Sequence, residues 1–313
     1  MNAHLKRFQL IEKIRTFFKN EGFVDVITPP AVENPGMETH IHPFQLKSIK
    51  DQQEIPYFLH SSPEFCMKEL LSLGMDKIFT VSYCFRDEPK STIHRSQFLM
   101  LEWYRANERF EKIMEDCQNL INFCLESFPK YKDLGQIRKK TVQEVFQETI
   151  GVDILDYLTK EKIIPLIKNK FPEVPLHDPE MLQWDDCFFL LFLNMVEPKL
   201  DTDSPLLIYE YPAPLSAYST LKKEDPRVCE RFEIYWRGME LCNCFNELTD
   251  PSEQKKRLID QGQSKKNQYG YSLPYPKKFQ SVMDNGLPPS CGIALGVERL
   301  LMALDQTENP FWE

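Results

Sequence analysis

The chain has 313 residues, of which 42% are hydrophobic and 27% charged, and its formal net charge is -9. This balance is typical of a globular protein with one large domain or two smaller ones, and it excludes a fibrous or disordered chain. The sequence contains no apolar run of about 18 residues, so it predicts no membrane-spanning helix.

The first half of the chain alternates helical and strand patterns. Apolar residues at helical spacing open it, and Gly22 ends this helix before an extended segment that stops at Pro29. Ser62, Pro63 and Glu64 form a good helix start, with a serine cap and a proline in the first turn. In order, we predict a helix over 5–18, strands over 23–28 and 57–60, a helix over 64–74, a hairpin of 78–85 with 98–104, and a helix over 107–128.

The second half begins less regularly. Residues 131–200 contain short helical patterns, several prolines and a buried-looking apolar run. The later elements are clearer: strands over 206–211, 232–236 and 239–245, a polar helix over 252–262, and a strand that runs into a helix over 292–303. Because no repeat or linker divides the chain, we predict one α+β domain over 1–313, with a mostly antiparallel sheet flanked by helices.

Cysteine content and charge distribution limit the partners. The nine cysteines are scattered and follow no secretion signal, which predicts reduced thiols and a cytoplasmic protein. An acidic nucleic-acid-binding enzyme concentrates its basic residues in one module, and the only basic clusters here, such as Lys265–Lys266 and Lys277–Lys278, are short. We therefore expect no tRNA and no membrane as partners.

Several predicted strands carry charged residues at positions where a buried, apolar core is expected. Glu102 shares a strand face with Tyr104, and Glu233 shares one with Tyr235, because side chains alternate along a strand. On the strand after the turn at 237–238, alternation predicts that Glu240, Cys242, Cys244 and Asn246 share one face and that Leu241, Asn243, Phe245 and Glu247 share the other.

A carboxylate inside a sheet costs several kcal/mol unless it is paired or ligated. One explanation is structural: internal salt bridges and hydrated sheet edges. The other is a pocket that binds a cation through carboxylates and an anion through Arg86 and Arg299, since carboxylates together with phosphate oxygens suit magnesium. The pattern alone leaves both open.

Two further motifs are weak. Cys242 and Cys244, or His40 and His42, lack the spacing of a structural zinc site. The segment around Gly292 and Gly296 lacks the Lys-Ser/Thr of a P-loop, and we expect these glycines to let the backbone approach a flat ligand.

Three segments together resemble the class II aminoacyl-tRNA synthetases. Residues 22–29 resemble motif 1, residues 85–104 resemble motif 2, and residues 292–299 resemble motif 3. Residues 62–64 and 240–247 narrow the resemblance to the lysyl-tRNA synthetase branch. Motif 1 begins almost at the first residue, so we expect no anticodon-binding domain. The chain then resembles the ligases that attach (R)-β-lysine to a lysine side chain of elongation factor P.

This resemblance implies an antiparallel sheet of six or seven strands, a homodimer formed through motif 1, and activation of (R)-β-lysine or lysine by ATP with Mg²⁺. The implied catalytic residues are Arg86 and Arg299. The implied amino-acid site consists of Ser62, Pro63, Glu64, Glu102, Tyr104, Asn243, Phe245, Glu247 and Ala294. The implied ATP site consists of Arg86, Asp87, Glu88, Arg95, Phe98, Glu240, Leu241, Gly296 and Arg299, and the implied magnesium ligands are Glu233 and Glu240.

The chain departs from lysyl-tRNA synthetases at a few positions. Ala294 stands where they carry glycine, and its methyl group could shift substrate preference by roughly 1–3 kcal/mol. Arg95 replaces an asparagine and is expected to meet phosphate, Asp87 replaces an asparagine, and Cys244 replaces a glycine and is expected to add bulk beside the pocket.

Two other functions are considered. One is a reduced lysyl-tRNA synthetase that still charges tRNA. The other is a non-catalytic synthetase-like regulator, which would be expected to lose an ATP-site arginine or a magnesium carboxylate. Arg86, Arg299, Glu233 and Glu240 are all present, and this favours catalysis.

Overall fold

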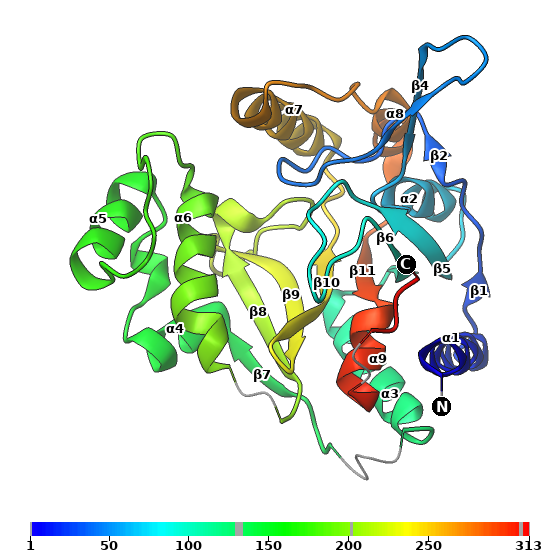
Figure 1. The fold of residues 1–313 in the computed structure, drawn as a ribbon, viewed down its shortest axis with the longest axis horizontal. Helices are drawn as coiled ribbons and strands as arrows, with labels where there is room; N and C mark the ends of the chain where they lie inside the picture. Colours follow the sequence, from blue (N-terminus) through cyan, green and yellow to red (C-terminus); the bar gives the residue numbers. More distant parts are fainter. Residues whose placement is uncertain (1, 129–133, 201–202, 307–308, 313) are drawn as a thin grey trace. The chain divides into compact units, whose positions relative to one another are not determined.

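The computed structural model describes residues 2–128, 134–200, 203–306 and 309–312 (Figure 1). These residues form two compact units: unit 1 is Met1–Asp133 with Asn246–Glu313, and unit 2 is Leu134–Phe245. Each unit combines helices with mostly antiparallel strands, so the predicted α+β class is confirmed. That residues 1–313 make up one catalytic domain remains a prediction. Residues 131–133, the start of the segment predicted to be irregular, lie outside the described residues.

Unit 1 contains the predicted motif 2 hairpin and the motif 3 strand in one sheet. Its strand order is β1-β5-β6-β11, with β5, β6 and β11 antiparallel and β1 parallel to β5. The strands are β1 (Val24–Asp25), β5 (Lys77–Phe85), β6 (Gln97–Ala106) and β11 (Ser290–Gly296). A smaller sheet has the order β2-β4-β3 and consists of β2 (Ala31–Val32), β3 (Gln45–Lys47) and β4 (Glu54–Leu59). The strand predicted over 23–28 is therefore shorter than expected, and β3 was not predicted.

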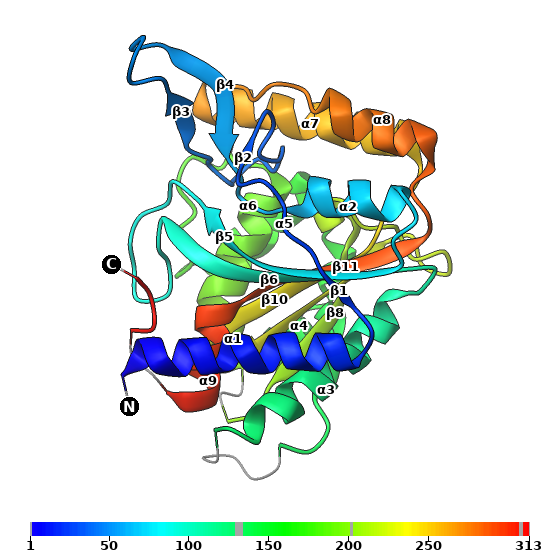
Figure 2. The same ribbon diagram turned by 90° about the vertical axis from the view of Figure 1, so that its right-hand side faces the viewer.

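Helices cover both faces of the unit 1 sheet (Figure 2). One face carries α1 (Ala3–Asn20), α3 (Phe110–Leu125) and α9 (Val297–Asp305), and the other carries α2 (Glu64–Ser72), α7 (Pro251–Tyr269) and α8 (Lys277–Gly286). The predicted helices all form, and α7 is longer than the predicted polar helix over 252–262, because Asp250 caps its start and Gly270 ends it in the left-handed conformation.

A buried ion pair connects α1 with α9 and β6. Arg7 of α1 is fully buried, donates to the Pro310 carbonyl at 2.9 Å, and lies 3.9 Å from Oε1 of Glu298. The other carboxylate oxygen of Glu298 accepts the backbone N–H of Leu99 at 3.0 Å. These three elements are thus joined by polar contacts as well as by apolar packing.

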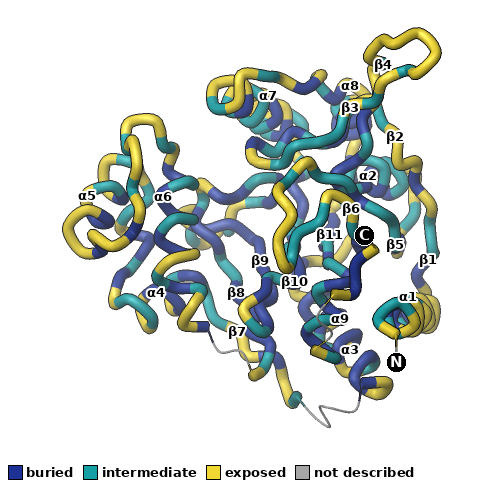
Figure 3. Tube along the Cα trace, in the orientation of Figure 1, coloured by how far each residue is buried: buried dark blue, intermediate teal, exposed yellow. Residues whose placement is uncertain are grey.

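Unit 2 has four strands of the larger sheet and its own core. The strand order is β10-β9-β8-β7, antiparallel except for the parallel pair β7–β8. The elements are β7 (Arg138–Thr141), α4 (Val142–Ile150), η1 (Ile154–Asp156), α5 (Lys160–Lys170), α6 (Trp184–Leu191), η2 (Phe192–Val196), η3 (Glu197–Lys199), β8 (Leu206–Pro212), η4 (Ala213–Leu215), β9 (Val228–Trp236) and β10 (Met239–Asn246). The larger sheet thus has eight strands within the described residues, where six or seven were predicted, and the smaller sheet adds three. Figure 3 shows that the chain over β8 and β9 is mostly buried, and aromatic residues of α4 and α6 pack in the same core.

The β9–β10 hairpin contains a bulge that changes which residues share a face. Arg237 and Gly238 form the predicted turn, both with positive φ (56° and 68°). Glu240 pairs with Tyr235 and Asn243 pairs with Glu233, and the register shifts between Glu240 and Cys242. Since directly paired residues lie on the same face, the extra residue brings Glu240 to the face of Asn243. The predicted alternation, which put these two on opposite faces, is wrong.

All nine cysteines of the chain are free, and eight of them are buried. Within the part of the chain that the structure describes, no helix combines the length and the apolar character that crossing a bilayer requires.

Candidate active site

Glu102 is the centre of a buried polar cluster in unit 1. It is 0% exposed and accepts hydrogen bonds from Ser62 Oγ at 2.5 Å and from the Tyr104 hydroxyl at 3.0 Å. The predicted common face of Glu102 and Tyr104 is therefore confirmed. Ser62 Oγ also accepts the backbone N–H of Glu64, and Pro63 is the N-cap residue of α2. Burial raises the pKa of the Glu102 carboxyl to about 8.

Lys68 joins two more carboxylates of the same cluster. Its Nζ lies 2.5 Å from Glu64 Oε1 and 2.7 Å from Glu247 Oε2, and its side chain is 1% exposed. Burial opposes the charge of this lysine, but Glu247 and Glu64 outweigh that effect and raise the pKa of Lys68. Burial also raises the pKa of Glu247 to about 7 although Lys68 opposes the shift. Three carboxylates thus share one resident cation.

Sequence reasoning missed Lys68. A signal was present, because Lys68 follows Glu64 by four residues and the two side chains must be neighbours on a helix. The contact with Glu247, 179 positions further on, has no such local signal.

Arg86 presents an unsatisfied donor next to an aromatic ring. Its Nε atom is buried and has no hydrogen-bond acceptor among the described residues. The guanidinium lies 5.3 Å from the centre of the Phe98 ring, and both side chains are half-buried. Asp87 is fixed through its backbone N–H, which donates to the His42 carbonyl at 2.7 Å, and Glu88 is half-buried. A buried guanidinium donor without an acceptor fits an anionic ligand such as a carboxylate or phosphate.

The other predicted ATP residues of unit 1 are engaged differently. The Arg299 guanidinium lies 3.0 Å from Nε2 of His94, and Gly296 lies at the start of α9, beside the Arg299 side chain. Arg95 donates to the His94 carbonyl at 2.8 Å and to Asn309 Oδ1 at 3.3 Å. The structure therefore directs Arg95 toward its own loop and the C-terminal segment.

In unit 2, the Glu233 carboxylate accepts hydrogen bonds from three donors. One of its oxygens accepts from Arg231, and the other accepts from the hydroxyls of Tyr211 at 2.6 Å and Tyr235 at 2.7 Å. Arg231 Nε also donates to Asn243 Oδ1 at 3.0 Å. The predicted common face of Glu233 and Tyr235 is confirmed. These three donors fit Glu233 for the role of an anchor for Arg231, and its predicted role as a magnesium ligand remains a prediction.

The remaining predicted residues of unit 2 lie on β10. Phe245 lies under the Arg231 guanidinium, whose carbon is 5.6 Å from the ring centre. Glu240 is half-buried, while Leu241 is 2% exposed and belongs to the core. Cys244 is 0% exposed and is the strand neighbour of Phe245, so it points to the opposite face. The prediction that Cys244 adds bulk beside the pocket is therefore wrong for the face that carries Asn243.

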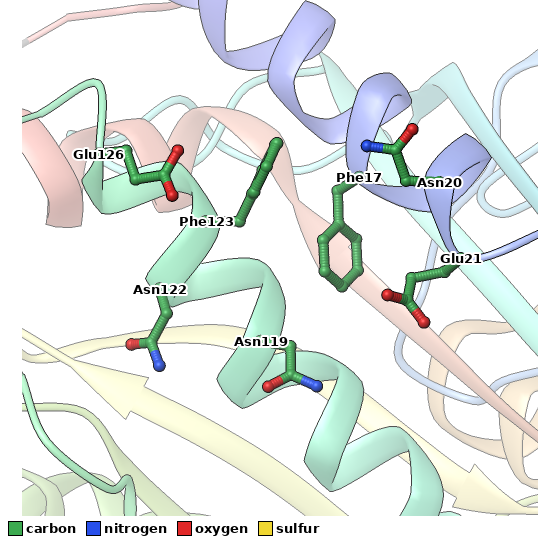
Figure 4. Close-up of a pocket in the computed structure, with 7 residues that line it drawn as sticks. All are labelled: Phe17, Asn20, Glu21, Asn119, Asn122, Phe123 and Glu126. Carbon is green, nitrogen blue, oxygen red and sulfur yellow. The ribbon is translucent and has the colours of Figure 1, made fainter.

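A groove of about 320 Å³ lies elsewhere in unit 1, between the end of α1 and α3 (Figure 4). Its lining residues are Phe17, Asn20, Glu21, Asn119, Asn122, Phe123 and Glu126. None of them belongs to the predicted site, so this groove is separate from the cluster around Glu102.

Comparison with known proteins identifies the family. The model of the tRNA synthetases class II (D, K and N) matches residues 1–309. The chain belongs to the class II tRNA synthetases. Curated relatives similar to it include proteins named elongation factor P–(R)-β-lysine ligase from Haemophilus influenzae (strain Rd; 33% identical over 96% of this chain and 91% of the relative), Avibacterium paragallinarum (34%, 97% and 92%) and Pasteurella multocida (35%, 95% and 89%).

In this class II synthetase chain, the register of motif 3 against motif 2 explains Gly292. Strand β11 places Gly292 opposite Tyr104 and Ala294 opposite Glu102. A Cβ atom on Gly292 would lie 2.1 Å from Tyr104 Cε1 and 2.7 Å from Glu247 Oε1. The glycine is therefore needed for the close approach of Tyr104 and Glu247, and the expectation of room for a flat ligand is wrong at this position.

Substituting Gly292→Ala is expected to destabilise the protein by about 1–3 kcal/mol, because the added methyl group overpacks a buried site. The free energy of unfolding, from urea denaturation, measures this effect. Gly296→Ala is the matched control, since its Cβ would lie no closer than 3.5 Å to its nearest neighbour, Arg299. Equal losses in the two variants would contradict the packing argument.

Proposed function

We propose that this chain activates (R)-β-lysine with ATP as an aminoacyl-adenylate and transfers the aminoacyl group to a lysine side chain of elongation factor P. The relatives that carry this name support the proposal over nearly the whole length of both chains. The class II synthetase family supports ATP-dependent activation of an amino acid.

The observation that carries the proposal is the charge pattern of unit 1. Glu64, Glu102 and Glu247 share one resident cation, and Arg86 has a buried donor without an acceptor among the described residues. β-Lysine carries two ammonium groups and one carboxylate. Its ammonium groups would compensate the excess of carboxylates, and its carboxylate would occupy the Arg86 guanidinium.

The activation step needs no covalent group from the protein. The carboxylate of the amino acid attacks the α-phosphorus of ATP, the bond to pyrophosphate breaks, and negative charge builds up on the phosphoryl oxygens. Arg86 donors aimed at that charge lower the barrier, and we propose Arg299 for the same role. Orientation of the two reactants supplies much of the rest, about 7–11 kcal/mol in favourable cases. We propose that Glu88 and Phe98 hold the adenine, that Asp87 borders it, that Gly296 gives it close approach to the backbone, and that Arg95 meets phosphate. The ATP-site role of Leu241, a core residue of unit 2, remains a prediction.

Around the amino acid, we propose that Glu64 binds the ammonium group near the carboxylate and that Glu102, Tyr104 and Glu247 bind the distal one. Ser62 and Pro63 would hold Glu64 and Glu102 in place, and Ala294 would complete the wall in unit 1. The amino-acid-site roles of Asn243 and Phe245 of unit 2 remain predictions.

Magnesium is proposed as the ion that accompanies ATP, where it would neutralise phosphate charge. Glu240 is half-buried on β10 and suits a carboxylate ligand for it. We propose that Glu233 fixes Arg231, because both of its oxygens accept hydrogen bonds.

The acceptor in this proposal is a protein and not tRNA. The net charge of -9 supports this, since phosphate backbones bind through basic surfaces. We also propose a cytoplasmic location, which suits nine free cysteines.

The test of the proposal is ATP–pyrophosphate exchange with (R)-β-lysine, with L-α-lysine and with no amino acid, followed by the intact mass of elongation factor P. Exchange strongest with β-lysine and a β-lysyl mass increase would support it. Exchange with α-lysine alone would favour charging of tRNA, and no exchange would favour a binding protein.

Affinity for β-lysine is expected to rise with pH between about 6 and 8. Burial raises the pKa of Glu102 to about 8 and that of Glu247 to about 7, so both carboxyls are largely protonated at the lower pH. An ammonium group binds the ionised forms better, and KM for β-lysine in the exchange reaction should fall as they ionise. KM for ATP is the internal control. In Glu102→Gln the upper part of this pH dependence should vanish, and a KM that is flat in the native protein would contradict the assignment.

A homodimer through motif 1 is proposed from the apolar surface of this segment. Phe8 of α1 is 51% exposed, and Ile27, just after β1, is 96% exposed. We expect a mass in solution of about twice 37.0 kDa, measured by light scattering, and a shift toward the monomer in Ile27→Asp. Met181→Asp, at an apolar side chain of unit 2 that is 75% exposed, is the control and should leave the mass unchanged. A native monomer would contradict the proposal.

A further inference from the structure

Glu38 lies in a loop of unit 1 that is held firmly by α7. The backbone N–H and hydroxyl of Thr39 both donate to Gln261 Oε1, at 2.8 and 2.6 Å. Lys265, which is 0% exposed, donates to the carbonyls of Thr39 at 2.8 Å and Ile41 at 2.7 Å. These contacts fix the backbone directly after Glu38, from which its side chain projects.

The chain also leaves room for the Glu38 carboxylate. Gly36 has a φ of +122°, which side chains rarely adopt, and a Cβ at this position would lie 2.5 Å from Glu38 Oε2. The same Cβ would lie 3.4 Å from Ser61 Oγ, which donates to the Pro35 carbonyl at 2.7 Å. Any residue other than glycine at position 36 would thus displace the carboxylate.

The charges that face Glu38 come from three elements. Glu64 belongs to α2, Arg86 follows β5, and Lys265 belongs to α7. Burial, followed by the negative charge of Glu64, raises the pKa of Glu38 to about 7, although Arg86 and Lys265 oppose the shift. The side chain is only half-buried, so a second molecule can reach it. A carboxyl with a pKa near neutrality is suited to proton transfer at physiological pH.

The loop that carries Glu38 adjoins the proposed amino-acid site, since its His42 carbonyl accepts the backbone N–H of Asp87 at 2.7 Å and the Cβ position of Gly36 lies 3.4 Å from Ser61 Oγ. In the proposed function, Glu64 binds the ammonium group near the reacting carboxyl and Arg86 binds the carboxyl itself. Glu38 interacts electrostatically with both Glu64 and Arg86, so in this arrangement it would lie on the same side of the site as the carbonyl carbon of the adenylate. The transfer step needs a group there, because a lysine ε-ammonium must lose a proton before it can attack.

We propose that Glu38 is the general base of the transfer step. This inference rests on the proposed function. The Glu38 carboxylate removes one proton from the acceptor ε-ammonium, and the neutral amine attacks the carbonyl carbon. A C–N bond forms, the bond from the carbonyl carbon to the phosphate oxygen breaks with its electron pair going to AMP, and the second amine proton goes to water.

The test separates activation from transfer. The adenylate is formed first with enzyme, ATP and (R)-β-lysine, elongation factor P is then added, and the β-lysyl product is followed by intact mass over one turnover. Glu38→Gln is expected to slow this transfer about 100-fold or more, and to slow ATP–pyrophosphate exchange far less. Glu33→Gln is the matched control, since Glu33 is an exposed glutamate of the same segment. It should leave both rates unchanged.

The pH profile gives a second readout that a structural role would not change. In the native enzyme the logarithm of the transfer rate should rise with pH and bend near 7, where Glu38 becomes fully ionised. In Glu38→Gln it should keep rising without that bend, because only the amine then titrates, and Glu38→Asp should restore part of the rate and the bend.

Three results would overturn the inference. A Glu38→Gln variant with normal transfer would exclude a base. Equal slowing of exchange and transfer, with a raised KM for β-lysine, would make Glu38 a ligand for the substrate's ammonium group. An unchanged bend in Glu38→Gln would assign the titration to another residue. If the native enzyme shows no exchange with β-lysine, the proposed function itself fails, which is distinguishable from each of these results.

Discussion

Replacing Arg86 with alanine is expected to lower the rate of ATP–pyrophosphate exchange about 100- to 1,000-fold, because one donor to developing negative charge is removed. Stability should change little, since the buried Nε of Arg86 has no acceptor among the described residues and its guanidinium packs over the Phe98 ring, 5.3 Å from the ring centre. The exchange rate and the thermal midpoint, measured on the same preparations, test both parts.

Arg86→Lys separates charge from geometry. Lysine keeps the positive charge but not the planar fork, so this variant should recover only a small part of the rate. Arg109→Ala is the surface control, because its side chain is 59% exposed and its partner Glu111 is exposed as well. A large loss of stability in Arg86→Ala, or a full rate in Arg86→Lys, would contradict the proposed contact with substrate.

Replacing Lys68 with methionine is expected to destabilise the protein by about 3–5 kcal/mol. The substitution leaves Glu64 and Glu247 facing each other without the buried cation that lies 2.5 and 2.7 Å from them. Urea denaturation measures the free energy of unfolding. The loss should be larger at higher pH, because Glu247, whose pKa burial raises to about 7, is then ionised.

Lys278→Met is the matched control on the same side of unit 1. Lys278 pairs with Glu69 at 2.7 Å, but its side chain is 76% exposed, so its loss should cost about 0–1 kcal/mol. The double variant Lys68→Met/Glu247→Gln should recover part of the stability, since it removes one of the two carboxylates that Lys68→Met leaves without a cation. Equal losses in the two lysine variants would show that burial does not decide the effect.

Local signals predicted most elements of unit 1. The Ser-Pro-Glu start of α2 and the periodicity of α3 depend on neighbours within a few residues, and both helices form. The common face of Glu102 and Tyr104 follows from strand alternation alone.

Long-range register could not be predicted in the same way. The bulge in β10 is a single extra residue that alternation does not reveal, and it moves Glu240 to the other face. The role of Gly292 depends on its position opposite Tyr104, which only the pairing of β11 with β6 determines. Glu38 carried no signal in the sequence, because its neighbours Glu64, Arg86 and Lys265 come from three distant segments.

The contacts of Arg7 link the N-terminal helix α1 to the part of unit 1 that is proposed to bind the nucleotide. Arg7 reaches Glu298, and Glu298 holds the backbone N–H of Leu99, the residue that follows Phe98. A partner protein that shifts α1 would therefore also shift β6, the strand that carries Phe98, and Phe98 is proposed to hold the adenine. Assembly through α1 and nucleotide affinity would then be thermodynamically coupled, each altering the other by the same factor.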